Sequence, residues 1–176
     1  MIRVLYFFLF SCFFCSAQDH HQLMRYSEYY NRDIEDFKRF MAIEPTVSQS
    51  TFGIRQLVYE LETHNVGVEE HRDNNGKIGE IYIFQTYNDH QQAFSQWKFY
   101  FDAMIKDLAL TFIKGIYDNG VIKKNHLSAS ELLLLIQPDN IISKSSYGVR
   151  FRKQDVFHSL FVVNGNLVYT VDEKEF

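Results

Sequence analysis

Apolar residues recur at spacings of three and four in two segments of the first third of the chain, the period of a helix with one buried face. The first segment is residues 20–42, which Pro45 follows closely. The second is residues 51–64, where Gly53 and several β-branched residues weaken the pattern. We therefore predict two amphipathic helices before residue 65.

The longest apolar stripe lies in residues 88–116 and predicts a central helix packed on a sheet. Its members are Phe94, Trp97, Phe101, Met104, Leu108 and Phe112. A shorter helix is predicted at residues 128–137, where Ser128 and Glu131 have the spacing of a capping box.

Alternation of apolar and polar residues predicts strands in the remaining segments. Residues 66–87 are typical of a hairpin, because Asn75 and Gly76 suit a tight turn. In its second strand one face carries Ile78, Glu80, Tyr82 and Phe84, and the other carries Ile81, Ile83 and Gln85. Apolar residues on both faces favour a strand that is buried on both sides at its middle. Three short segments, residues 147–152, 157–163 and 167–171, complete the set of strands.

Helices and strands thus come in runs, in the order ααββααβββ. This order predicts an α+β fold in which amphipathic helices pack on a mostly antiparallel, curved sheet. The length of 176 residues suits one such domain, which we place at residues 18–176.

Residues 1–17 differ from the rest and have the pattern of a cleavable signal peptide. Arg3 precedes an apolar run over residues 4–14, which is shorter than the roughly 20 residues of a membrane-spanning helix. Small residues before the expected cleavage site place the cut after Ala17. A lipoprotein anchored through Cys12 is the alternative, although bulky Phe10 fits it poorly. The prediction is an exported protein, periplasmic or secreted.

Charge and cysteine content narrow the partners and cofactors. The chain has 18 Lys and Arg against 22 Asp and Glu, a net charge of −4, and no basic run that would favour nucleic acid. Both cysteines, Cys12 and Cys15, lie in the signal region, so the mature chain is expected to have no disulfide and no zinc–thiolate site. No histidine or carboxylate spacing matches a metal motif. We expect no metal, no cofactor and no transmembrane segment in the mature chain.

Three residues are weak candidates for catalysis. Glu69 and His71 lie together in the predicted hairpin and could form a carboxylate–imidazole pair. His158 lies in a predicted strand and would need a partner from elsewhere in the chain, because successive strand residues point to opposite faces. Solvated surface residues are the simpler interpretation of the first pair.

Arg150, Arg152 and Lys153 form a small basic patch that could bind an acidic partner or a ligand carboxylate. The alternative interpretation is an edge strand that is kept soluble by charge.

These observations favour a non-enzymatic binding protein, of an inhibitor or immunity type, that works in the cell envelope and whose partner is another protein. The alternative is a small hydrolase or ligand-binding domain with a pocket between the long helix and the sheet. The sequence leaves the partner, the substrate and the oligomeric state open.

Overall fold

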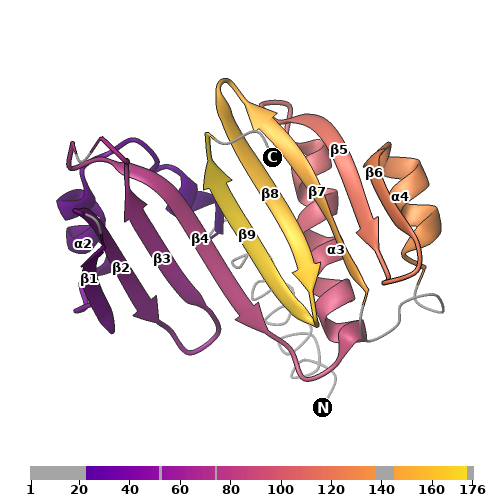
Figure 1. Ribbon diagram of the computed structural model, residues 1–176, viewed down its shortest axis with the longest axis horizontal. Coiled ribbons are helices and arrows are strands. Elements are labelled where there is room, and N and C mark those ends of the chain that lie inside the picture. Colours follow the sequence, from indigo (N-terminus) through magenta and orange to yellow (C-terminus); the bar gives the residue numbers. More distant parts are fainter. Residues whose placement is uncertain (1–22, 52, 74, 138–144, 174–176) are drawn as a thin grey trace, which may run out of the picture.

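The computed structural model describes residues 23–51, 53–73, 75–137 and 145–173, and the predicted signal peptide lies outside them. The described strands form one antiparallel sheet of nine strands in the order β1-β2-β3-β4-β9-β8-β7-β5-β6 (Figure 1). Their bounds are β1 (Val47–Thr51), β2 (Ile54–Glu60), β3 (Asn65–Glu70), β4 (Ile78–Thr86), β5 (Thr111–Asp118), β6 (Lys123–Leu127), β7 (Ser146–Lys153), β8 (Val156–Val163) and β9 (Asn166–Asp172). The predicted α+β class and antiparallel sheet are confirmed.

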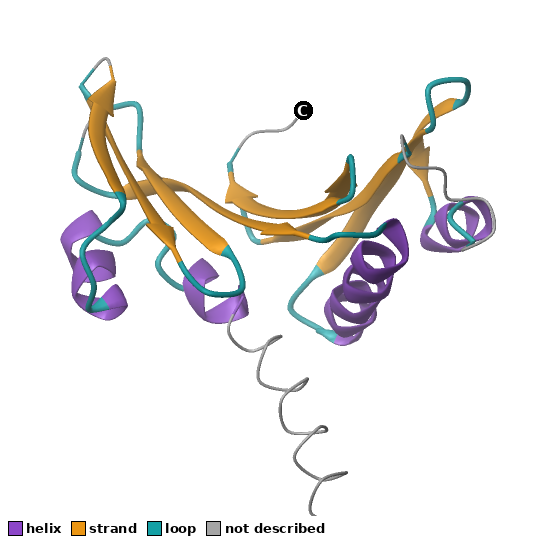
Figure 2. Cartoon of the chain, turned by 90° about the horizontal axis from the view of Figure 1, so that it is seen from below, coloured by secondary structure: helices purple, strands orange, loops and turns teal. Residues whose placement is uncertain are grey.

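The helices α2 (Ile34–Met41), α3 (His90–Lys106) and α4 (Ala129–Leu135) lie on one side of the sheet. Figure 2 shows that the two wings of the sheet bend away from these helices, so the sheet is concave on the opposite side. We call the side without these helices the open face. No helix of the described residues lies over it.

The longest described helix, α3, packs its apolar side against the centre of the sheet. Asp89 begins the helix by accepting hydrogen bonds from the backbone N–H groups of Gln91 and Gln92. Trp97 is fully buried, and its indole N–H donates to the carbonyl oxygen of Leu160 in β8 at 3.1 Å. The space between α3 and the sheet is therefore filled by side chains.

The predicted helix at residues 51–64 is wrong. Residues 47–60 form the hairpin β1–β2 instead, and Gly53 lies in its turn with a φ of +80°. The apolar face that suggested a helix consisted of Ile54, Leu57, Val58 and Leu61. Along β2, however, the buried residues Leu57 and Tyr59 alternate with more exposed neighbours. In so short a segment, β-branched residues and a glycine favour a hairpin over a helix.

The predicted helix at residues 88–116 is half right. It ends at Lys106, and residues 111–118 form β5. Leu108, which the stripe placed in the core, is fully exposed. Asp107 ends the helix and accepts a hydrogen bond from the backbone N–H of Ala109. The β-branched residues after this turn favour a strand.

The predicted helix at residues 20–42 is interrupted. Residues 23–27 are helical, and the chain then turns through Asn31, which has a φ of 61°. Asp33 caps the second helix, α2, by accepting from the backbone N–H of Glu35. A strong cap inside an apolar stripe marks such a break.

The hairpin β3–β4, the final strands and the capping box of α4 match the prediction. The predicted order ααββααβββ is wrong, because the sequence pattern missed β1, β2, β5 and β6 as strands. Strand β4 is also not buried on both faces: Gly79 is an extra residue opposite a shift in the β3–β4 register, and beyond it Tyr82 and Phe84 remain partly exposed.

Candidate functional site

The open face carries a continuous band of apolar side chains across the sheet. Strand alternation and register place one or two of them on each of six strands. We call this set the open-face stripe: Val47, Val58, Tyr82, Phe84, Val168, Phe161 and Ile116. All are at least partly exposed, and Phe84 is 37% exposed.

Two glycines hold aromatic rings of the stripe flat against the sheet. Gly67 is opposite Tyr82, and a Cβ atom at Gly67 would lie 1.9 Å from Cζ of that ring. Gly148 is likewise opposite Phe161, where a Cβ atom would lie 2.0 Å from Cδ1. The two rings thus occupy the space of absent side chains, which fixes their orientation.

Beside the stripe, a buried ion pair fastens β7 to β9 across β8. Arg150 donates from Nη2 to Oδ1 of Asp172 at 3.1 Å, and both side chains are 3% exposed. The guanidinium lies over the ring of Phe157, 4.3 Å from its centroid. This burial removes Arg150 from any exposed basic patch.

The other two members of the predicted basic patch are exposed. Arg152 pairs with Asp155 at 3.1 Å and donates from Nε to the carbonyl oxygen of Gln154. Lys153 lines a cavity on the other side of the sheet. Strand β7 lies between β8 and β5, so it is not an edge strand.

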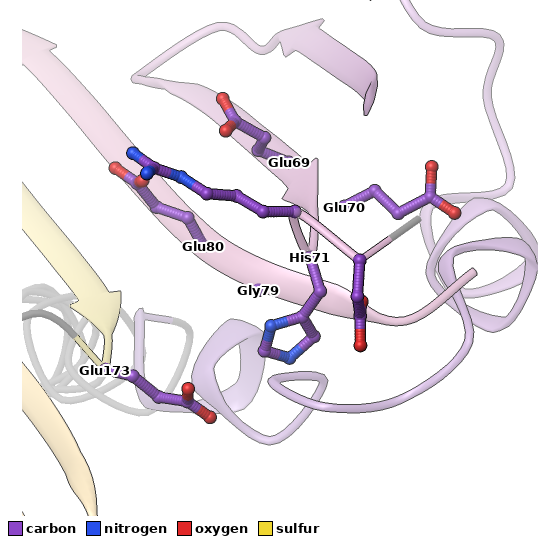
Figure 3. Close-up of a pocket in the computed structure, with 8 residues that line it drawn as sticks. Glu69, Glu70, His71, Gly79, Glu80 and Glu173 are labelled. Atoms are coloured by element: carbon purple, nitrogen blue, oxygen red, sulfur yellow. The ribbon is translucent and has the colours of Figure 1, made fainter. Parts of the chain in front are cut away.

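Glu69 and His71 line one cavity of about 350 Å³ at the end of β3 (Figure 3). Its lining includes five carboxylates and the guanidinium of Arg72. The side chains of Glu69 and His71 project in opposite directions (Figure 3). Glu69 accepts a hydrogen bond from Gln56 on the open face, whereas His71 packs against Tyr30 on the helix side. The two groups share a cavity without facing each other.

His158 lies on the helix side of β8, where it is 4% exposed. Its Nδ1 is hydrogen-bonded to the hydroxyl of Tyr169 at 2.7 Å. Burial lowers the pKa of the imidazole to about 4, and the positive charge of Lys153 adds to this effect, so His158 is neutral at pH 7. It borders a cavity of about 450 Å³ that is separate from the one at His71 except for shared Glu173.

The three catalytic candidates are thus distributed over the open face, the end of β3 and the helix-side core. Among the described residues no three His, Cys, Asp or Glu side chains come close enough to hold a metal ion. None of the described helices has the length and apolar character needed to span a bilayer.

Comparison with known proteins identifies no family for this chain. The sequence matches no protein-family model and no curated protein. A similar solved structure is that of a cysteine-rich secretory protein from Staphylococcus aureus subsp. aureus Mu50, with 11% identity and a TM-score of 0.44. The alignment covers 84% of this chain and 45% of that one, so the chain spans less than half of its length. A likeness at this level identifies neither a shared fold nor a shared function.

Proposed function

We propose that this protein is an exported binding protein without catalytic activity, and that it recognises another protein through the open face of its sheet. The observation that carries this proposal is the open-face stripe. Soluble proteins rarely leave a large contiguous apolar patch exposed unless it is an interaction site. An inhibitor or an immunity-type protein would use such a surface.

The shape and stiffness of the open face support the proposal. The sheet is concave on this side, which suits a convex surface of a partner (Figure 2). Tyr82 and Phe161 are held in place by the glycines beneath them, so little side-chain entropy is lost when a partner binds. Glu69 on one wing and Arg152 on the other supply a polar rim around the apolar centre, as in many protein interfaces.

The alternative, an enzyme or ligand-binding domain with a pocket under α3, has less support. Stacked and edge-on rings occupy the contact between α3 and the sheet: Trp97 lies 5.0 Å from Phe101 and 5.3 Å from Tyr147 between ring centroids. The candidate residues Glu69, His71 and His158 do not converge on one point.

Photo-crosslinking tests the proposed surface. A photoreactive phenylalanine analogue replaces Phe84 on the open face or, as the control, Leu134, an exposed residue of α4. We expect protein adducts from position 84 that are absent from position 134, and we expect Phe84→Glu to abolish co-purification of the same partner. Identical adducts from both positions, or a partner that Phe84→Glu retains, would contradict the proposal.

The proposed export rests on Arg3, the apolar run of residues 4–14 and the small residue Ala17. N-terminal sequencing of the protein from an envelope or medium fraction should begin at Gln18. Recovery of intact Met1 from the cytosol would contradict export, and a lipid mass on Cys12 would indicate a lipoprotein instead.

A further inference from the structure

The two edges of the sheet differ in how they are protected against pairing with another strand. At one edge, β6 carries Lys123 and Lys124, pairs with β5 through an irregular register, and contacts α4. Charges and irregularities of this kind oppose strand addition. At the other edge, β1 has the sequence Val-Ser-Gln-Ser-Thr, with neither charge nor proline, and residues 47–50 are exposed. Of the two edge strands in the described sheet, β1 is therefore the one that is open to a further strand.

We propose that β1 pairs antiparallel with β1 of a second copy of this chain, which joins two sheets into one continuous dimeric sheet. The sequence of β1 is nearly symmetric about Gln49, and this symmetry favours a second copy of the same strand as its pairing partner. A two-fold axis at Gln49 places Ser48 opposite Ser50 of the second copy and Val47 opposite Thr51. Each cross-strand pair then joins residues of similar size, and none brings like charges together.

A hydrogen bond within the protomer orients the side-chain amide of Gln49 at the edge of the sheet. Its Nε2 donates to Oε1 of Gln56 at 2.7 Å, and Gln56 in turn donates to Glu69. This hydrogen-bond ladder crosses β3, β2 and β1 and ends at the edge. A primary amide has two N–H donors and a carbonyl oxygen, so two Gln49 side chains facing each other across the axis can exchange hydrogen bonds.

The electrostatics of the edge permit self-association. Ser50 lies opposite Arg55 in β2, and Arg55 is paired with Glu35 at 2.7 Å and with Glu70 at 3.4 Å. Its charge is therefore compensated within the protomer. In a continuous antiparallel sheet the two open faces point to the same side, which makes the dimer bivalent for a partner of the open face.

The interface is small, because two five-residue strands bury far less than the roughly 1,600 Å² of a standard protein interface. We therefore expect a weak, concentration-dependent dimer. Sedimentation velocity over about three orders of magnitude in concentration measures it. The double variant Ser48→Lys with Ser50→Lys places ammonium groups opposite each other across the axis, and it should raise the dimer Kd at least about tenfold. The matched control, Thr86→Lys with Ser95→Lys, adds the same charge at exposed sites away from β1 and should leave the Kd unchanged.

A cysteine cross-link tests the register. In the full chain with Cys12→Ser and Cys15→Ser, Gln49→Cys faces itself across the axis with Cβ atoms about 4.5–5.5 Å apart, near disulfide geometry. We expect rapid formation of a disulfide dimer from Gln49→Cys and none from Thr86→Cys.

A protein that stays monomeric at all concentrations would overturn the proposal, as would a dimer that survives the Ser48 and Ser50 lysines. A dimer lost in Phe84→Glu but kept in the lysine variant would also overturn it, because it would place self-association on the open face. Loss of partner binding with an intact dimer would reject only the proposed function.

Discussion

Replacement of Trp97 by alanine tests whether α3 is packed on the sheet as described. The indole is fully buried, stacks on Phe101 at an interplanar angle of 7°, and meets Tyr147 edge-on at 85°. It also donates a hydrogen bond to the Leu160 carbonyl in β8. The substitution removes all of these contacts from the centre of the core.

The expected cost follows from these contacts. Truncation of a buried tryptophan to alanine usually lowers the free energy of unfolding by about 3–5 kcal/mol. Two aromatic pairs and one buried hydrogen bond place Trp97→Ala at the upper end of that range. Because a domain of this size has about 5–15 kcal/mol in total, the variant should lose roughly a third or more of its stability.

Lys98→Ala is the matched control. Lys98 lies one position further along α3, and its Nζ bonds the carboxylate of Asp102 at the surface, one helical turn away. Surface pairs of this kind contribute about 0.3–0.5 kcal/mol, so this variant should lose no more than about 0.5 kcal/mol.

Urea unfolding measured by far-UV circular dichroism compares the two variants, because Trp97 is the only tryptophan and its fluorescence is lost in the variant. Fluorescence of the unmodified protein gives a second readout, with blue-shifted emission and weak acrylamide quenching expected for a buried indole. Equal, small losses of stability in Trp97→Ala and Lys98→Ala would refute the packing of α3 on β8.

Three further changes test the open face and the buried polar groups. Gly148→Ala should lower the free energy of unfolding by about 1–3 kcal/mol, and by less in a Phe161→Ala background, because the added methyl group meets that ring; equal losses in both backgrounds would contradict this. Asp172→Ala should lower the free energy of unfolding by about 3–5 kcal/mol in the same urea assay, because it leaves Arg150 buried without its carboxylate partner. A loss below about 1 kcal/mol would mean that the ion pair is solvated. The pKa of His158 is lowered from 6.5 to about 4, so the unfolded chain binds a proton that the folded one does not, and stability should fall as pH drops from about 6.5 to about 4. NMR titration of the imidazole checks this, and a midpoint near 6.5 would disprove the burial of His158.

Elements with local signals were predicted correctly. The capping box of Ser128 and Glu131 acts within a few residues, so the sequence alone reveals it. The errors have a common cause. Apolar residues at spacings of three and four also occur in a strand that has apolar residues on both faces, as in β5, and only tertiary pairing decides between the two structures.

The candidate site was harder to predict than the fold. Charged and imidazole side chains are natural candidates for function in a sequence. In the structure, however, Arg150 and His158 are buried and have partners inside the protein. The residues of the open-face stripe are ordinary apolar residues, and their exposure depends on which face of the sheet the helices cover. Alternation in β4 did place Tyr82 and Phe84 on the face opposite Ile81 and Ile83, which was the available signal.

The position of the helices also bears on the proposal that the open face binds a partner. An apolar side chain on a sheet is part of the core when a second layer covers it, and in this chain the described helices α2, α3 and α4 all cover the opposite face. The glycines opposite Tyr82 and Phe161 let both rings lie flat against the sheet. If this face were simply exposed to solvent, we would expect polar residues on it, because antiparallel sheets with one solvated face usually carry them there. Phe84, Val168 and Phe161 lie side by side on adjacent strands, and in the proposed function a partner would supply the missing layer over them.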